Sequence, residues 1–303
     1  MSSRIVITGA GGQLGSVLAA QVADQGREVL ALTSSQWDIT DPAAAESIVK
    51  NGIVKHGDVV INCAAYTDVD GAETDESAAY AVNATGPEHI ARACARAGAR
   101  LIHVSTDFVF TGDVDPHPYE PSDETDPRGV YACSKLAGEK AVLAALPAAV
   151  VVRTAWVYTG GSGKDFVAVM RRLAAADGPV QVVDDQVGSP TYVVDLAAAL
   201  LQIADDGVPG PVLHAANEGV VSRFELARAV FEESGADAAR VRPVSTAQFP
   251  RPAPRPSYSA LSSRESAAAG LKPLRQWRCA LAAALAASGG VAPADRPLPS
   301  TRD

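Results

Sequence analysis

The feature that most constrains this chain is a short apolar run that leads directly into three spaced glycines. The run covers residues 4–8, and Gly9, Gly12 and Gly15 follow it in the segment TGAGGQLG. Gly9 permits a tight turn, Gly12 lets a bound group approach backbone N–H groups, and Gly15 lets a helix pack closely on a sheet. We therefore predict a strand, a turn and a helix whose N-terminus is suited to binding an anion.

Strands and helices are expected to alternate along the first half of the chain. Strand-like runs of apolar residues are separated by Ala-rich stretches with helical periodicity. This repetition is typical of an α/β fold, a Rossmann-type doubly wound parallel sheet with right-handed crossovers. The predicted strands cover residues 4–8, 28–32, 58–62, 100–104 and 149–153, and the predicted helices cover residues 13–25, 42–50, 72–97 and 131–146.

The pattern is less regular after residue 153. Helices are predicted over residues 166–176, 192–205 and 223–234, and a short strand over residues 211–214. Four prolines between positions 249 and 258 exclude a helix there and favour an ordered or ligand-covering loop. Residues 288–303 are rich in proline, serine and charge, which predicts a flexible tail.

Charge and composition exclude several classes of protein. The net charge of −9 gives no long-range attraction to nucleic acid, so we expect no DNA or RNA partner. No run reaches the roughly 18–20 uninterrupted apolar residues of a membrane helix, and the N-terminus lacks a signal-peptide pattern. The four cysteines form no CxxC pair. These features predict a cytoplasmic protein with reduced thiols and no membrane partner.

The glycine-rich turn predicts a bound dinucleotide, and the end of the second strand bears on which one. NAD-selective proteins usually carry an acidic residue there, which binds the ribose hydroxyls. Here the strand runs into Thr33, Ser34 and Ser35, with neither an acid nor an arginine. The hydroxyl groups could bind a 2′-phosphate. We therefore expect NADPH to be preferred and NADH to be accepted as well.

Three residues form a candidate catalytic group. Tyr131 and Lys135 are spaced i, i+4, which places them on one face of a helix. A lysine cation one turn away is expected to lower the tyrosine pKa, which is ordinarily near 10. Thr106 follows the fourth strand, at the sheet edge where ligands bind in such folds. Its hydroxyl can stabilise negative charge on a carbonyl oxygen, and the adjacent Ser105 is the competing candidate.

Seven segments resemble the dTDP-4-dehydrorhamnose reductase family, of the extended short-chain dehydrogenase/reductase superfamily, over nearly the whole chain. General sugar-nucleotide epimerases share the glycine turn and the YxxxK spacing but usually lack the last two segments. In the family pattern STDYVF, Phe108 replaces the tyrosine. The segments are ITGAGGQLG, WDITD, NCAAYTDVDGAE, HVSTDFVF, YACSKLAGE, VVRTAWVY and DDQVGSPT.

The resemblance implies a role for each matching position. The implied catalytic residues are Thr106, Tyr131 and Lys135, and the implied substrate contacts are Thr106, Asp107 and Trp156. The implied cofactor-binding residues are Gly9, Gly12, Gln13, Leu14, Gly15, Asp38, Ile39, Ala64, Ala65, Tyr66, Tyr131 and Lys135.

Several of these positions have a structural alternative. Asp38 is the implied adenine contact, but it or Asp41 could instead cap the following helix. Trp156 could belong to the core. Asn83 resembles a helix residue that orders the catalytic site, or it could bond within its own helix. Further candidates for the thymidine diphosphate end are Tyr192, Phe249, Arg251 and Arg255.

The implied reaction is NAD(P)H-dependent reduction of a dTDP-linked 4-keto-6-deoxy sugar, dTDP-4-dehydro-L-rhamnose, to dTDP-L-rhamnose for cell-surface polysaccharide. We expect residues 1–155 to bind the cofactor, with later returns to that domain near 190–217. Residues 156–287 are then mainly the smaller substrate-binding region, and 288–303 the tail. The chain is expected to be a monomer or a homodimer.

Some family members hold magnesium with glutamates at a dimer interface. Two of those positions fall at Val17 and Val194, which cannot bind a cation, so a magnesium requirement is doubtful and no metal ligand is predicted. Two rival functions remain open. One is another nucleotide-sugar epimerase or reductase, and the other is a non-catalytic, NADP-binding regulatory subunit of methionine adenosyltransferase.

Overall fold

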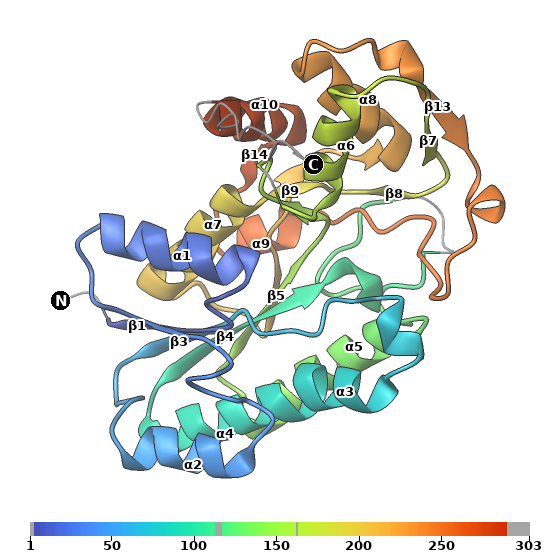
Figure 1. Ribbon diagram of the computed structural model, residues 1–303. Coiled ribbons are helices and arrows are strands. Elements are labelled where there is room, and N and C mark those ends of the chain that lie inside the picture. Colours follow the sequence, from blue (N-terminus) through green and yellow to red (C-terminus); the bar gives the residue numbers. More distant parts are fainter. Residues whose placement is uncertain (1–2, 113–116, 162, 290–303) are drawn as a thin grey trace, which may run out of the picture.

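A computed structural model describes residues 3–112, 117–161 and 163–289 of the chain (Figure 1). Its centre is a six-stranded sheet in which every pairing is parallel, in the order β10-β5-β4-β3-β1-β2. This confirms the predicted α/β class with a doubly wound parallel sheet. The strands are β1 (Ile5–Thr8), β2 (Val29–Leu32), β3 (Val59–Asn62), β4 (Arg100–Thr106), β5 (Val150–Thr154) and β10 (Val212–His214).

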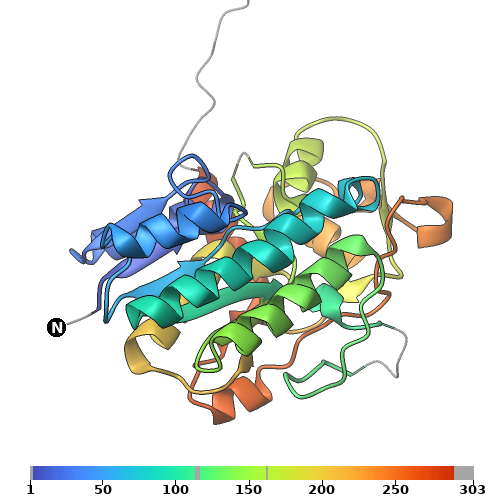
Figure 2. The same ribbon diagram turned by 90° about the horizontal axis from the view of Figure 1, so that it is seen from below.

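Helices cover both faces of the sheet, as Figures 1 and 2 show. Successive strand residues point to opposite faces, so Ile5 and Ile7 pack in the core below α1 and α7, while Val6 packs in the core on the α2 and α4 side. Burial on both faces explains why these strands are continuous apolar runs. The covering helices are α1 (Gln13–Asp24) and α7 (Val193–Asp206) on one face, and α2 (Pro42–Lys50), α4 (Gly86–Ala97) and α5 (Val130–Ala145) on the other.

The segment predicted as a helix over residues 72–97 is helical from Glu76 to Ala97, but it is not one regular α-helix. It consists of η1 (Gly71–Glu73), α3 (Glu76–Tyr80), a wide π-helical turn at Ala81–Thr85, and α4. Pro87 stands in the first turn of α4, and it has no backbone N–H to continue a regular helix through the turn. The turn is anchored from outside the helix, since Asn83 bonds to both backbone groups of Tyr66.

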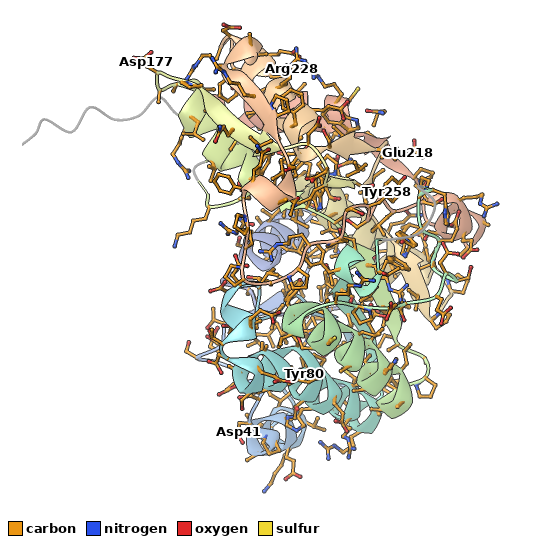
Figure 3. All side chains as sticks on the ribbon, turned by 90° about the vertical axis from the view of Figure 1, so that its right-hand side faces the viewer. Asp41, Tyr80, Asp177, Glu218, Arg228 and Tyr258 are labelled. Atoms are coloured by element: carbon orange, nitrogen blue, oxygen red, sulfur yellow. The ribbon has the colours of Figure 1, made fainter. Side chains whose placement is uncertain are left out.

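The later part of the chain builds a second, smaller lobe with its own core, in which Leu226 and Phe231 are fully enclosed. In Figure 3, Asp41 of the sheet lobe and Asp177 of this lobe lie at opposite ends of the molecule. The elements of this part are β6 (Val157–Tyr158), α6 (Phe166–Ala174), β7 (Val180–Val183), β8 (Val187–Gly188), β9 (Thr191–Tyr192), β11 (Asn217–Glu218), β12 (Val221–Ser222), α8 (Arg223–Glu233), β13 (Val241–Val244), α9 (Arg264–Ala268), β14 (Leu274–Gln276) and α10 (Trp277–Gly289).

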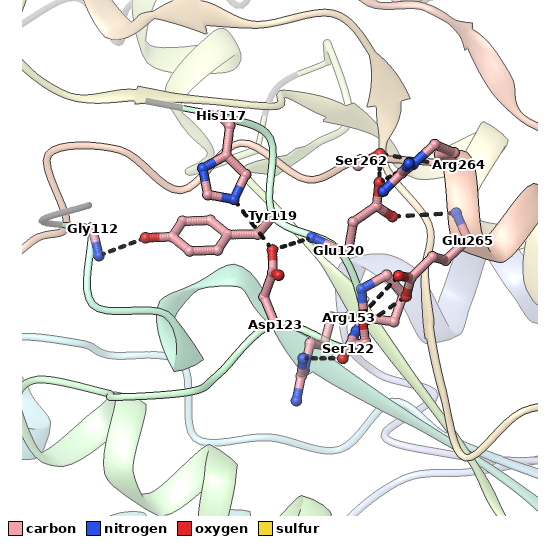
Figure 4. A network of polar contacts seen from close by, with 11 residues as sticks. Gly112, His117, Tyr119, Glu120, Ser122, Asp123, Arg153, Ser262, Arg264 and Glu265 are labelled. Carbon is pink, nitrogen blue, oxygen red and sulfur yellow. Dashed lines mark hydrogen bonds and ion pairs between the residues drawn. The ribbon is translucent and has the colours of Figure 1, made fainter. Parts of the chain in front are cut away.

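Polar contacts tie the segment after β4 to the region of α9 (Figure 4). Glu120 accepts hydrogen bonds from Ser262 Oγ at 2.6 Å and Arg264 Nε at 2.8 Å. Ser122 Oγ donates to Glu265 Oε1 at 2.7 Å. The carboxyl edge of the sheet is thereby joined to a part of the chain more than 140 residues away in sequence.

Three other expectations concern the C-terminal part and the membrane. The segment 249–258 contains no helix, as its prolines predicted. Of the predicted tail, Ser288 and Gly289 end α10, and residues 290–303 lie outside the described residues. Within the described ranges, no helix is both long enough and apolar enough to cross a membrane.

Candidate active site

A cavity of about 440 Å³ lies at the carboxyl edge of the sheet. Three segments that the sequence predicted to carry site residues contribute to its wall. They are the glycine turn, the end of β4 and the first turns of α5. Sequence reasoning missed several wall residues, although they follow or end strands and so lie at the predicted edge. The wall is made of Gly12, Gln13, Leu14, Cys63, Ala65, Thr67, Val104, Ser105, Thr106, Asp107, Tyr131, Lys135, Thr154, Trp156 and Val157.

Tyr131 is the second residue of α5, and Thr106 is the last residue of β4. Burial raises the pKa of the Tyr131 hydroxyl to about 12, against an opposing effect of the Thr106 hydroxyl. For the chain's own residues, desolvation of the phenolate dominates, and the expected lowering of this pKa by Lys135 in the cofactor-bound site stays a prediction. The consequence is that Tyr131 keeps its proton near neutral pH.

Lys135 lies one turn further along α5 and is almost fully enclosed. Its Nζ donates to the backbone carbonyl of Val104 at 2.8 Å, which fixes the ammonium group beside β4. Burial lowers the pKa of Lys135 to about 8, and the carboxylate of Glu139 acts in the opposite direction. The ammonium form still predominates at pH 7, and two of its three donors remain for other partners.

Asp107 is buried directly behind Thr106. Its Oδ1 accepts a hydrogen bond from Thr106 Oγ1 at 3.1 Å, and its Oδ2 accepts one from Ser259 Oγ at 2.5 Å. Burial raises the pKa of Asp107 to about 6 despite these two donors. Ser259 follows the proline-rich segment, and no local sequence signal connects it with a residue 152 positions earlier.

The glycine turn has the shape that a pyrophosphate requires. Gly9 has φ +69°, and a Cβ added there would lie 2.5 Å from the Ala64 nitrogen. A Cβ on Gly15 would lie 2.4 Å from the Gly9 oxygen. Gly12 precedes α1 and supplies no side-chain cap, so the first N–H groups of that helix can turn to a ligand. These residues fit a dinucleotide phosphate, with Gln13 and Leu14 in the same first turn.

The candidate adenine contacts lie after β2. Asp41, and not Asp38, caps α2 by accepting from the Ala43 N–H at 2.8 Å. Asp38 is exposed and accepts from the N–H and the hydroxyl of Thr40, which lower its pKa. Ile39 is buried in the core beneath α2 and α4. Asp38 therefore has no capping role, and its contact with adenine stays a prediction.

The residues after β3 are held rigidly. The Ala64 N–H donates to Asn62 Oδ1, while Ala65 lines the cavity. Asn83 accepts from the Tyr66 N–H at 2.9 Å and donates to the Tyr66 carbonyl at 3.1 Å. Its amide also donates to Ser134 Oγ. Asn83 thus joins this loop to α5, and the alternative that it bonds within its own helix is wrong.

Trp156 lines the cavity, and its backbone is left-handed, with φ +47°. It is the sole non-glycine residue with positive φ in the described parts of the chain. Its indole packs against Gly188, where an added Cβ would lie 2.7 Å from the ring. The guanidinium carbon of Arg223 lies 3.5 Å from the ring centroid. One face of the indole is therefore covered by protein, which restricts how a sugar can pack on it.

The weaker candidates for the nucleotide end differ in position. Tyr192 is buried in the second lobe and stacks on Tyr158 at 5.8 Å, so its predicted ligand contact is wrong. Arg251 and Arg255 both form ion pairs with Asp70, at 2.9 and 3.0 Å. The side chain of Phe249 is 49% exposed. Of these four candidates, only Tyr192 has its position explained by packing in the core.

The two magnesium positions of the family carry packed apolar side chains here. Val17 lies against the core beneath α1 and α7 and against that of the second lobe, and Val194 lies against the latter. Across the residues that the structure describes, no group of three or more His, Cys, Asp or Glu side chains could hold a metal ion.

Comparisons with known proteins match nearly the whole chain. The family model described as RmlD substrate binding domain matches residues 3–289. A dTDP-4-dehydrorhamnose reductase from Mycobacterium tuberculosis is 75% identical over 305 residues, covering 100% of this chain and 99% of the relative.

Two solved structures extend the match to the fold. A dTDP-4-dehydrorhamnose reductase from Clostridium acetobutylicum is 37% identical, with a TM-score of 0.88, covering 94% of this chain and 99% of that one. The Bacillus anthracis reductase, solved in complex with NADP, is 35% identical, with a TM-score of 0.86 and coverage of 93% and 98%. This chain belongs to the dTDP-4-dehydrorhamnose reductase family.

Proposed function

We propose that this chain reduces the 4-keto group of dTDP-4-dehydro-L-rhamnose to give dTDP-L-rhamnose, with NADPH as reductant. The observation that carries the proposal is the meeting of Thr106, Tyr131 and Lys135 with the glycine turn around one cavity. The names of the relatives supply the substrate, and the NADP complex of one of them supports the cofactor.

Tyr131 is the proton donor in this reaction. NADPH, when bound, supplies a hydride to the carbonyl carbon of the sugar. The carbonyl oxygen then takes the phenolic proton of Tyr131, which is present at neutral pH because burial holds the pKa at about 12. The high pKa is no obstacle in this direction, since Tyr131 must be protonated before the reaction and gives its proton to an oxygen on which negative charge develops.

Thr106 and Lys135 orient the reacting groups. The Thr106 hydroxyl can turn from Asp107 to the carbonyl oxygen, where it stabilises the developing negative charge. Lys135, fixed by the Val104 carbonyl, directs its remaining donors to the hydroxyls of the nicotinamide ribose. Its positive charge also favours the phenolate that Tyr131 becomes after giving up its proton.

Cofactor preference is proposed from the end of β2. Thr33 Oγ1 lies 2.9 Å from Ser35 Oγ and donates to Gln36 Oε1, so this turn presents polar groups and no carboxylate. Such a turn accommodates the 2′-phosphate of NADPH and also the free hydroxyl of NADH. The remaining proposed cofactor contacts are Gly9, Gly12, Gln13, Leu14, Gly15, Asp38, Ile39, Ala64, Ala65 and Tyr66.

The division of labour along the chain follows from this proposal. Residues 1–155, with α7 and β10, bind the cofactor, and residues 156–287 mainly bind the dTDP-sugar, with Trp156 as their first contact. Asp107 contacts the sugar from the first part, at the end of β4. The chain acts as a monomer or homodimer in the cytoplasm, where nucleotide-activated sugars are made.

The test is NADPH oxidation with a panel of dTDP- and UDP-linked 4-keto sugars, followed by identification of the product. Preferential turnover of dTDP-4-dehydro-L-rhamnose, with one sugar reduced for each NADPH oxidised, is expected. Exchange of stereochemistry without net use of cofactor would instead indicate an epimerase. Absence of turnover together with co-purification of a methionine adenosyltransferase would indicate the regulatory subunit.

A further inference from the structure

Arg223 is the first residue of α8, and its guanidinium lies against two aromatic rings. Its central carbon is 3.5 Å from the centroid of Trp156 and 5.0 Å from that of Phe166. Among the described residues, none forms a hydrogen bond or an ion pair with this guanidinium. Five N–H donors on a half-buried cation are therefore left without a protein partner.

Other enclosed arginines in the molecule are satisfied by the protein. Arg153 is paired with Glu139 at 2.8 Å, and Arg4 with Asp58 at 2.6 Å. Arg255 is paired with Asp70. Arg223 differs from them because its charge is partly removed from water and no described residue pairs with it. Burial accordingly lowers the pKa of Arg223 to about 10.

The two stacked groups are held rigidly in place. Ser222 caps α8 through a reciprocal capping box with Glu225, and the Arg223 N–H donates to the Gln186 carbonyl at 3.0 Å. Trp156 is fixed by its left-handed backbone and by contact with Gly188. Strain of this kind persists only where the surroundings enforce it, and it is concentrated at functional sites.

The charges around Arg223 favour an anionic ligand. The charge of Asp107 raises the pKa of Arg223, but both oxygens of Asp107 already accept hydrogen bonds from Thr106 and Ser259. Arg255 adds a second positive charge to the surroundings of Arg223. Trp156 is part of the cavity wall, and the guanidinium of Arg223 stacks on its ring, so this unpaired cation lies next to a residue of the wall.

We propose that Arg223, stacked on Trp156, binds a phosphate of the substrate's diphosphate group. The planar guanidinium can donate two parallel hydrogen bonds to phosphate oxygens, and its face keeps contact with the indole. Substrate binding then supplies the missing partner and fixes the sugar relative to Trp156. The inference rests on the proposed function only in taking the substrate to be a nucleoside diphosphate sugar.

The experiment compares binding of dTDP, thymidine and NADPH by calorimetry to the wild-type chain and to Arg223→Gln. We expect the dissociation constant for dTDP to rise on the order of 10–100-fold, the effect of losing a charge-assisted contact. Binding of NADPH should stay within about twofold. Arg223→Lys should keep part of the affinity, because it retains the charge without the fork. The matched control is Arg228→Gln, on the exposed side of the same helix, which should change none of the three constants.

Two results would overturn the inference. One is an unchanged dTDP affinity in a folded Arg223→Gln variant. The other is an equal loss of dTDP and thymidine binding, which would mean that Arg223 only supports Trp156. If the Gln variant does not fold, the Lys variant decides the question by the same comparison. Failure of the proposed function is distinguishable, since the wild-type chain would then bind dTDP through Arg223 but reduce no dTDP-linked 4-keto sugar.

Discussion

Ser105 Oγ donates a hydrogen bond to Glu139 Oε1 at 2.6 Å, inside the protein. Glu139 also holds the guanidinium of Arg153, so the Ser105 hydroxyl belongs to a buried ion-pair network between β4, α5 and β5. The adjacent Thr106 is not part of this network, and its hydroxyl meets Asp107 instead. Of the two hydroxyl residues that end β4, Thr106 is therefore the one available for the substrate carbonyl.

This assignment predicts opposite outcomes for two neighbouring variants. Thr106→Val removes a donor to the carbonyl oxygen, and turnover should fall by about 10²–10³ with little change in melting temperature. Ser105→Ala should keep turnover within about threefold but lower the free energy of unfolding by ~1–3 kcal/mol, because Glu139 loses a buried partner. Steady-state kinetics and urea unfolding of both variants measure this. A larger kinetic loss in Ser105→Ala would reverse the assignment.

Tyr131→Phe removes only the phenolic hydroxyl. Because the hydroxyl is the proposed acid, turnover should fall by about 10²–10⁴ in a stopped-flow or steady-state assay of NADPH oxidation. NADPH affinity and the melting temperature should be close to those of the wild-type chain, since the ring and its edge contact with Phe108 remain. Near-normal turnover would remove Tyr131 from the mechanism.

The glycine turn allows a matched pair of substitutions. A Cβ on Gly15 would lie 2.4 Å from the Gly9 carbonyl oxygen, so the turn must move, whereas a Cβ on Gly11 meets nothing nearer than a Thr33 methyl at 3.8 Å. We expect Gly15→Ala to weaken NADPH binding by about tenfold or more, ~1.4 kcal/mol, measured by fluorescence titration. Gly11→Ala should bind NADPH within about threefold of wild type. Equal effects would mean that the shape of the turn does not determine affinity.

The sheet and the catalytic trio were predictable because their signals are local. Strands buried on both faces are continuous apolar runs, and the i, i+4 spacing of Tyr131 and Lys135 needs only a helix to bring them to one face. The strand ends were less accurate: β4 continues to Thr106 rather than ending at Val104. Thr106 is thus the last residue of the strand, still at the predicted edge.

The remaining features depend on contacts between distant parts of the chain. The π-helical turn between α3 and α4 is anchored by Asn83 on Tyr66, and Ala-rich sequence alone favours a regular α-helix there. Ser259 accordingly reaches Asp107 across 152 residues, and Arg223 at the start of α8 stacks on Trp156 just after β5. The burial that raises the pKa of Tyr131 depends on such contacts as well, because the extent of burial is set by the assembled fold.

Chelation tests the expectation about metal. With valine at positions 17 and 194, neither side chain offers an oxygen ligand to a cation. EDTA should therefore leave both turnover and the sedimentation coefficient unchanged. A dimer that dissociates on chelation, and re-forms when Mg²⁺ is restored, would show that other ligands serve in their place.

Asp107 predicts a pH dependence of stability with a definite sign. Its pKa in the folded chain is about 6, above the ordinary value of 3.8, so the folded state holds the proton more tightly than the unfolded state does. Stability from this group is therefore complete below pH 4, falls as pH rises through the interval between the two values, and is lost above pH 6. Asp107→Asn cannot ionise and escapes this loss.

Relative to wild type, Asp107→Asn should accordingly be more stable at pH 7.5 than at pH 4, with a free energy of unfolding that is larger by on the order of 1–3 kcal/mol. Urea unfolding of both proteins at several pH values measures the difference, and subtraction cancels the titration of all other groups. Asp38→Asn is the contrasting control, because hydrogen bonds from Thr40 lower the pKa of that exposed carboxyl and the trend should be weak and opposite in sign. A difference for Asp107→Asn that does not vary with pH would mean that burial does not perturb this carboxyl group.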